Sequence, residues 1–597
     1  MSFPAAAAAG ETRIVPERSV ERSLVRPASV AWAGVCALIL LAPFEATRPL
    51  IALPWQSVST VETALIVVFA AWLASAFWSR STVQWLTPLT WPWIAFLGAM
   101  LLAALTGVDR INGLHMAGRF ALAFGVYLLT VNGITTLARL RGVVIAAAIA
   151  GAIVALLVLL EYLNVGPIMR ALTAFRPGIS VLGSQVRAGG PFQYPTIASM
   201  YLEMLFALTL GLLLLTIDAD RRQPSRGLRL GVGALFAIAL LISEAVTLTF
   251  TRSGLITIAT SLAIVAALRV WLSRLDRGTK VLFALAAVVA FQVLTSRSFE
   301  LLRLRMTTEG QEAWYRVSID APTELTIGTN AIASVPVTLT NTGRSSWDSD
   351  AIVPFRFSYH WLMADGEQVF RWEGVRTDFP FEVVPGQRVS LSARVEAPDR
   401  PGVYRLMWDV EQVQRLWFST EPDAELFTSL VAVDGPPAAR LAPVPSMTLP
   451  RRAVRPGRVD LWRAASRIAI AHPLLGVGPD NYRLIYGGFA GIANFDQRTH
   501  ANNMYLEILV GGGLAGALAF AWLCWRIAGR FTHPVLRPVD PRVATIAAAV
   551  LAAGAAIAIH GLVDSFLGFT GTYTLMAIVV GLAVAGDALN ERDAHRV

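Results

Sequence analysis

The sequence predicts an all-α polytopic membrane protein of about 12 transmembrane helices with an inserted extracytoplasmic β-sandwich domain. Three observations support this fold class. Hydrophobic residues make up 55% of the 597 residues and charged residues only 15%, whereas about 25% charged residues is usual in soluble domains. Apolar runs of about 20 residues recur, and such a run crosses a bilayer as a helix. One long stretch between them alternates apolar and polar residues, as strands do. The composition excludes a disordered chain, a fibre and an ordinary cytosolic enzyme.

The apolar runs predict where the chain crosses the membrane. We expect a cytoplasmic tail over 1–28, helices 1–9 over 29–296, helices 10–12 over 503–589 and a second cytoplasmic tail over 590–597. The first run is interrupted by Pro43, so its limits are the least defined. The approximate cores of the runs are 29–43, 58–78, 91–106, 113–133, 142–163, 194–217, 228–249, 253–272, 280–296, 503–526, 543–563 and 567–589.

Arginines predict the orientation of these helices. Cytoplasmic loops carry an excess of Lys and Arg, and here every second connecting loop is basic if the N-terminal tail lies inside. Both termini are therefore expected in the cytoplasm. The net charge is +9, and a basic chain can indicate nucleic-acid binding. Because the arginines lie between apolar runs, we expect no nucleic-acid partner. The segments predicted on the outer side are 164–193, 250–252, 297–502 and 564–571.

The outer segment 297–502 changes character along its length. Residues 315–434 alternate apolar and polar positions between turn sequences such as Asp365-Gly366 and Pro401-Gly402, which indicates short antiparallel strands. This part resembles immunoglobulin-like extracellular modules. A Pro-rich linker is predicted over 435–457 and an amphipathic helix over 458–471.

Two features of this insert leave alternatives open. The helix could lie on the membrane surface or pack on the β-domain. The tryptophans could stack on sugars, although core packing is favoured. These tryptophans are Trp347, Trp361, Trp372, Trp408 and Trp417.

Three residues at the predicted outer face are candidates for chemistry. His500 precedes a span, and a neutral imidazole there can accept a proton, although a polar interfacial role is the commoner one. Arg252 occupies a tight turn between two apolar runs, where an arginine is costly unless it is paired, hydrated or bound to an anion. Arg187 lies in an outer loop, and a guanidinium suits bidentate phosphate contacts. A solvated charge is the alternative for Arg187.

Other ionisable residues lie within or beside the predicted spans. Hydrogen bonding between helices is their commonest role, and Glu203 or Glu244 could instead pair with an arginine of the site. The sequence has no zinc-ligand spacing, no phosphate-binding glycine loop and no dinucleotide fingerprint, so we expect no metal and no cofactor. The residues concerned are Glu203, Glu244, Glu507, His560 and Asp564.

Four stretches resemble the O-antigen ligase and O-antigen polymerase superfamily of bacterial membrane glycosyltransferases. Thr251-Arg252-Ser253-Gly254 is similar to the family's Ser-Arg-Gly turn, and the loop from Arg187 to Pro195 is similar to its Arg-x-x-Gly-x-Phe-x-x-Pro loop. The segment from His472 to Tyr482 resembles the family's Pro-Leu-Leu-Gly-x-Gly-Pro-Gly-Asn-Phe segment. The segment from His500 to Gly516 resembles its His-Ala-His-Asn-x-Tyr-Leu block.

The resemblance implies a function in cell-envelope polysaccharide or lipopolysaccharide assembly, in the bacterial inner membrane, with the active site facing the periplasm. The donor would be a glycan linked to undecaprenyl pyrophosphate, and the acceptor a glycan, lipid or protein. His500 would be the catalytic base, and Arg187, Arg252 and Asn503 would bind substrate. The family histidine usually stands immediately before Asn, where this chain has Asn502. We expect His500 to take over its role, the alternative being lost or altered chemistry.

Several functions stay open at this point. The leading prediction is a ligase, and a polymerase of the same superfamily is the enzymatic alternative. A protein-glycosylating relative, in which the β-domain presents a polypeptide or guides the glycan, is a third. The non-enzymatic alternatives are a 12-helix transporter, whose site would normally lie near the bilayer midplane, and a receptor or scaffold that uses only the β-domain.

Overall fold

The predicted polytopic membrane architecture is confirmed by a bundle of long apolar helices. The computed structural model describes residues 17–53, 56–176, 178–183, 185–273, 275–296, 313–421, 424–437, 447–450 and 456–594. Among these residues, ten helices are long and apolar enough to cross a membrane, rather than about twelve, because the apolar helices Pro27–Leu41 and Thr90–Thr106 are shorter. The predicted tail up to residue 16 and linker positions 438–446 and 451–455 lie outside the described residues.

The bundle helices follow the order of the predicted spans. Among the residues that the structure describes, ten helices, α1–α10, precede the β-domain and five more, α12–α16, follow it. They are α1 (Glu17–Leu41), α2 (Thr60–Trp78), α3 (Thr90–Thr106), α4 (Arg110–Gly133), α5 (Leu137–Tyr162), α6 (Gly166–Leu172), α7 (Pro195–Arg222), α8 (Arg226–Leu248), α9 (Arg252–Ser273), α10 (Arg277–Thr295), α12 (Arg458–Ala471), α13 (Tyr482–Ala490), α14 (Met504–Leu536), α15 (Pro541–His560) and α16 (Thr570–Ala594).

Helix α7 lies at the centre of the bundle, between α5, α8, α9 and α15. In its most apolar window 94% of the residues are buried. Its partner α15 is rich in alanine, and small side chains let membrane helices approach closely. At Gly211 an added Cβ would lie 2.6 Å from the Cβ of Ala549. The α7–α15 contact therefore requires a residue without a side chain at this position.

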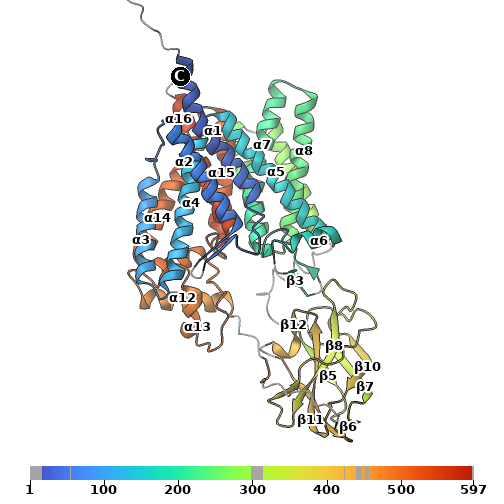
Figure 1. Ribbon diagram of the computed structural model, residues 1–597. Helices are drawn as coiled ribbons and strands as arrows, with labels where there is room; N and C mark the ends of the chain where they lie inside the picture. The colour runs from blue at the N-terminus through green and yellow to red at the C-terminus, as the bar shows by residue number, and fades with distance from the viewer. Residues whose placement is uncertain are drawn as a thin grey trace, which may run out of the picture.

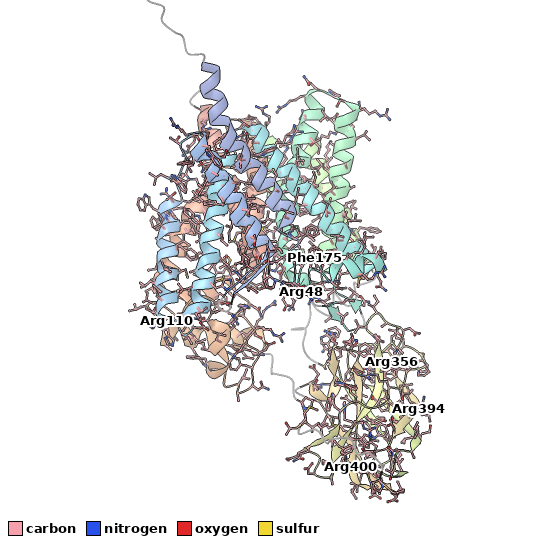
Figure 2. The ribbon with its side chains drawn as sticks, viewed as in Figure 1. Arg48, Arg110, Phe175, Arg356, Arg394 and Arg400 are labelled. Carbon is pink, nitrogen blue, oxygen red and sulfur yellow. The ribbon has the colours of Figure 1, made fainter. Side chains whose placement is uncertain are left out.

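The two ends of the bundle differ in what they carry. The start of α1 and the end of α16 lie together at one end, and α12, α13 and the β-domain lie at the other (Figure 1). Arg48 and Arg110 lie at the end that faces the β-domain (Figure 2). There the ring of Phe175, which follows α6, packs edge-on against Phe44, with 5.5 Å between the centroids. This is the end that the charge pattern predicts to face outward.

The inserted domain consists of two sheets that share one hydrophobic core. One sheet has the order β10-β7-β5, and the other has the order β6-β13-β11-β8-β9, with β12 pairing to β11. This supports the predicted sandwich in part. Strand β6 pairs with β13 in parallel, whereas only antiparallel strands were predicted, because the chain crosses between the sheets after β5. The strands are β5 (Val317–Asp320), β6 (Glu324–Gly328), β7 (Ile332–Asn341), β8 (Phe355–Met363), β9 (Val369–Arg371), β10 (Arg388–Glu396), β11 (Gly402–Gln412), β12 (Leu416–Trp417) and β13 (Phe427–Asp434).

Burial decides between the two roles considered for the tryptophans. Trp347, Trp361 and Trp408 belong to the core shared by the two sheets, and Trp417 is also buried. Trp372 is half-buried and stacks on the ring of His360, with 3.6 Å between the centroids. Core packing, the favoured alternative, therefore accounts for these rings, and they offer no open platform for a sugar.

Short elements lie in the loops between the long helices. Two hairpins, β1 (Ile51–Leu53) with β2 (Gln56–Val58) and β3 (Val181–Leu182) with β4 (Gln185–Val186), lie in the connecting loops. Helix α12 covers the residues predicted for an amphipathic helix, and it packs on α13 and α14. Its buried residues are Leu461, Ala464, Ala465 and Ile468.

Candidate functional site

A cavity of about 470 Å³ opens at the end of the bundle that carries α12 and α13. Its walls come from α3, α4, α7, α12, α14 and the loops that precede α7, α12, α13, α14 and α16. Arg187 and His500 both line it, so two of the predicted site residues meet although they are far apart in the sequence. Part of the wall is apolar and suits a lipid chain. This part includes Met100, Met116, Phe120, Met200, Ile508 and Leu567.

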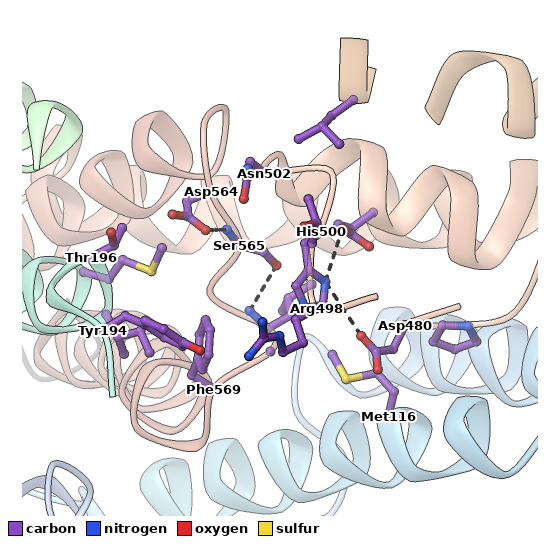
Figure 3. A pocket seen from close by; sticks show the side chains of 18 of the residues that line it. Met116, Tyr194, Thr196, Asp480, Arg498, His500, Asn502, Asp564, Ser565 and Phe569 are labelled. Atoms are coloured by element: carbon purple, nitrogen blue, oxygen red, sulfur yellow. Dashed lines mark hydrogen bonds and ion pairs between the residues drawn. The ribbon is translucent and has the colours of Figure 1, made fainter. Parts of the chain in front are cut away.

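His500 faces two carboxylates on its Nδ1 side. The Nδ1 atom lies 3.5 Å from Oε1 of Glu507 and 3.8 Å from Oδ1 of Asp480, and Figure 3 shows these contacts within the cavity. The same Oε1 of Glu507 accepts a 2.6 Å hydrogen bond from the backbone N–H of Ala501. A carboxylate beside Nδ1 favours the tautomer with a proton there. That tautomer leaves a lone pair on Nε2, so the imidazole can act as a base toward the cavity.

The acids also tune this imidazole. Burial lowers the pKa of His500, and the charge of Arg483 lowers it further. The hydrogen bond and charge of Glu507, together with the charge of Asp480, act in the opposite direction and are stronger. The pKa of His500 is therefore raised above its usual value. A raised pKa makes the neutral form a stronger base.

A break in α14 brings the segment from His472 to Tyr482 together with the segment from His500 to Gly516. Gly513 adopts φ +58°, outside the helical region, and an added Cβ would lie 2.5 Å from the backbone of Leu474. Backbone N–H groups freed or exposed by such a break need other partners. Here Leu514 N donates to Pro473 O at 2.8 Å, and Val477 N donates to Val510 O at 2.9 Å. The glycines therefore serve close packing, which places Asp480 next to His500.

Arg187 is held from several directions. Its backbone N–H donates to Ser180 O at 2.9 Å, and its Nε donates to Thr249 O at 3.1 Å. The next residues, Gly189 and Gly190, donate their N–H groups to one oxygen of Glu161, at 3.0 and 2.7 Å. The loop from Arg187 therefore lies against both α5 and the end of α8.

Glu161 is a residue that sequence reasoning missed. It is fully buried at the end of α5, and its other oxygen pairs with Arg176 at 2.5 Å. A buried charge of this kind persists only when it is paired and hydrogen-bonded. A glutamate at the edge of an apolar run was the available signal, and its partners lie too far along the chain to be inferred.

Arg252 and Asn503 do not line the cavity among the described residues. Arg252 begins α9, three residues after Thr249, which accepts the bond from Arg187. Asn503 caps α14, with its Oδ1 accepting from the N–H groups of Tyr505 and Leu506 at 3.0 Å and its Nδ2 donating to Leu562 O at 2.9 Å. These bonds hold the start of α14, and the substrate-binding role of Asn503 stays a prediction.

Arg498 is a second missed residue. It lines the cavity, and Figure 3 shows its guanidinium between Tyr194 and Phe569 on one side and Asp480 on the other. Asp496 holds it through a bidentate pair, at 3.0 and 3.1 Å, and this pair raises the pKa of Arg498. The available signal was its place two residues before His500, where the stretch that resembles the family begins.

A buried polar network lies where α7, α9 and α15 meet. Ser253 Oγ lies 2.8 Å from Nε2 of His560, whose Nδ1 lies 2.9 Å from Glu203. Thr257 donates to the same carboxylate at 2.5 Å. Glu203 and His560 therefore fill the commonest expected role, hydrogen bonding between helices. The network fixes the start of α9, the element that carries Arg252.

One group of side chains among the described residues has spacing suited to a metal ion, namely His533, Asp587 and Glu591. It lies on α14 and α16 near their far ends, away from the cavity. The guanidinium of Arg530 already pairs with Asp587 at 2.5 Å. Because this side chain supplies the positive charge there, the group does not fit a metal site.

Comparison with known proteins bears on the segment around His500. Residues 448–521 match the sequence model of the family Wzy_C, described as O-Antigen ligase. This stretch contains α12, α13 and the first half of α14, together with Asp480, Arg498 and His500. The predicted resemblance to the O-antigen ligase superfamily is confirmed. An O-antigen ligase domain within a bundle of apolar helices indicates an integral inner-membrane protein. The family implies a glycosyltransferase-like ligase or polymerase that acts on glycan-lipid substrates.

Comparisons with curated proteins and with solved structures do not bear on the fold or function of this chain. No curated protein matches the chain. An alkylpurine DNA glycosylase from Pseudomonas fluorescens, solved bound to DNA containing an abasic site analog, is 10% identical, with 57% of this chain and 97% of that chain covered. The TM-score is 0.13, so the likeness says nothing about fold or function.

Proposed function

We propose that this protein transfers a glycan from an undecaprenyl-pyrophosphate carrier to an acceptor hydroxyl at the outer face of the inner membrane. The observation that carries the proposal is one cavity that holds a carboxylate-flanked imidazole, His500, together with two guanidinium groups, Arg187 and Arg498. The apolar part of the wall suits the isoprenoid chain. The O-antigen ligase match over the His500 segment supports the same chemistry.

In the proposed reaction, His500 acts on the acceptor hydroxyl and the arginines act on the leaving diphosphate. Nε2 of His500 takes the proton of the acceptor hydroxyl, while Glu507 stabilises the imidazolium through Nδ1. The acceptor oxygen forms a bond to the anomeric carbon, and the bond from that carbon to the carrier phosphate breaks. Negative charge grows on the departing diphosphate, where Arg187 and Arg498 stabilise it. The proton then leaves His500 for water. Arginines supply the positive charge, so the proposal needs no metal ion.

The position of the cavity favours an enzyme over a transporter. A transporter site normally lies near the bilayer midplane, in broken helices. The polar residues of this cavity lie in the first turns of α7 and α14 and in the loops between helices. A ligase and a polymerase differ in acceptor, and the acceptor is not decided by these residues.

The test is a transfer assay with the full chain in lipid nanodiscs. An undecaprenyl-pyrophosphate-linked glycan and candidate acceptors are supplied in the presence of EDTA. We expect a glycosylated acceptor and an equal amount of released undecaprenyl pyrophosphate, measured by mass spectrometry. Chain elongation on the lipid carrier would identify a polymerase, and transport of the donor across proteoliposomes without any new glycosidic bond would contradict the proposal.

A further inference from the structure

The β3–β4 hairpin lies between the β-domain and the cavity. Val181 pairs with Val186, and Leu182 with Gln185. The pairing continues one step further, because the N–H of Arg187 donates to Ser180 O at 2.9 Å. Ser180 and Arg187, at the open end of the hairpin, both line the cavity. A displacement of the hairpin therefore changes the position of Arg187 directly.

The β-domain forms hydrogen bonds with the other end of this hairpin. Gln412, the last residue of β11, is fully buried, and its Nε2 donates to Gly183 O at 3.0 Å. Arg415 donates through Nη2 to Val181 O at 3.0 Å and through Nη1 to Gln412 Oε1 at 2.6 Å. The two side chains thus fix each other's orientation as well as the hairpin. We call Gln412 and Arg415 the hairpin clamp.

A glycine at the tip of the hairpin allows the hairpin and the β-domain to approach each other closely. Gly183 adopts φ +58°, a conformation that glycine accepts without strain. An added Cβ there would lie 3.0 Å from Oγ of Ser345, a buried residue of the β-domain. A residue with a side chain at this position would be strained in its backbone and would require Ser345 to shift by a few tenths of an ångström.

We propose that the β-domain is a positioning element for donor binding: the hairpin clamp holds the β3–β4 hairpin and thereby fixes Arg187 in the cavity. The inference rests on the proposed function, in which Arg187 binds the pyrophosphate. A loop ordered before binding loses less entropy when the ligand arrives. Gln412 and Arg415 act through Arg187, so they are positioning residues, and the domain serves the donor rather than the acceptor.

The kinetic test separates donor from acceptor. Gln412→Glu keeps the side-chain size but removes the donor to Gly183, and Arg415→Ala removes the donor to Val181. We expect each to raise the KM for the lipid-linked donor about fivefold, which corresponds to about 1 kcal/mol for one hydrogen bond, with the acceptor KM unchanged. Arg415→Lys, which retains a donor, should restore much of the loss.

The matched control is Arg394→Ala. Arg394 is exposed on β10, in the other sheet of the same domain (Figure 2), and its loss should leave both KM values unchanged. A rise in acceptor KM in the clamp variants, with donor KM unchanged, would overturn the proposal and favour acceptor presentation by the β-domain.

A second measurement does not depend on catalysis. Hydrogen–deuterium exchange at the amides of Arg187 and Ala188, which bond to Ser180 O and Leu248 O, should be about fivefold faster in both clamp variants than in the wild type. Faster exchange in a protein that transfers no glycan would uphold the positioning role and reject only the proposed function. Unchanged exchange in both clamp variants would overturn the positioning role, whatever the activity.

Discussion

His500 and Glu507 form the central pair of the site: Nδ1 of the imidazole lies 3.5 Å from Oε1 of the glutamate, in the first turn of α14. Glu507 also accepts the N–H of Ala501, so one carboxylate fixes the backbone beside the base and the side of the ring that carries a proton. The imidazole can then present Nε2 to the cavity.

Glu507→Gln tests this pair through the pH dependence of transfer. The base works only when neutral, so transfer rises as pH passes upward through the pKa of His500, which Glu507 raises. Glutamine keeps an acceptor for Ala501 but removes the charge, so the pKa falls and the rising limb of the pH–rate profile moves to lower pH. Asp480→Asn should shift it less, because Asp480 lies 3.8 Å away and also pairs with Arg483. An unmoved limb in Glu507→Gln would show that His500 is not the titrating base.

Arg498→Ala should weaken donor binding. A charge-assisted bond to phosphate contributes about 1.5–3 kcal/mol, so we expect the donor KM to rise roughly 10- to 100-fold. Arg463→Ala is the control, because Arg463 is exposed on α12 and pairs with the exposed neighbouring acid Asp460. Equal donor KM values for the wild type and Arg498→Ala would remove Arg498 from the site.

Asn503→Ala should destabilise the protein without changing donor binding. The side chain caps α14, and loss of such a cap lowers the free energy of unfolding by about 1–2 kcal/mol. Denaturant titration in detergent micelles measures the loss. Asn503→Asp keeps the cap acceptor but not the bond to Leu562, so its free energy of unfolding should lie between those of the wild type and Asn503→Ala. A higher donor KM with unchanged stability would instead support the predicted substrate-binding role of Asn503.

Glu161→Ala should be among the most destabilising single substitutions. It leaves Arg176 buried without its carboxylate partner, and breaking a buried pair lowers the free energy of unfolding by about 3–5 kcal/mol. Glu161→Gln keeps an acceptor for the N–H groups of Gly189 and Gly190 and should lose less. If both variants unfold at the wild-type denaturant concentration, the pair does not hold the Arg187 loop.

Much of this architecture follows from local sequence patterns. Apolar runs of bilayer length give the bundle, and the positive-inside pattern places His500 and Arg187 at one end, where the structure brings them into one cavity. The alternation around Val337 and Leu406 gives strands. These features could be predicted because each depends on residues that are neighbours along the chain.

The features that sequence reasoning missed depend on contacts between distant segments. Arg498 stands two residues before a recognisable stretch, but its direction into the cavity is set by Asp496 and the loop. The cap formed by Asn503 and the partners of Glu161 require the loops before α16 and α7 to be in place. The hairpin clamp joins Gly183 to Gln412, and nothing in either local pattern indicates that pairing.

The most direct test of the central claim is single-turnover transfer by His500→Gln with saturating lipid-linked donor and acceptor. Glutamine retains polar atoms but cannot take a proton at neutral pH. General base catalysis contributes about 10²- to 10⁴-fold, so we predict a rate lower by that factor, with donor binding and unfolding free energy close to those of the wild type. Transfer at the wild-type rate in this variant would contradict the assignment of His500 as the base.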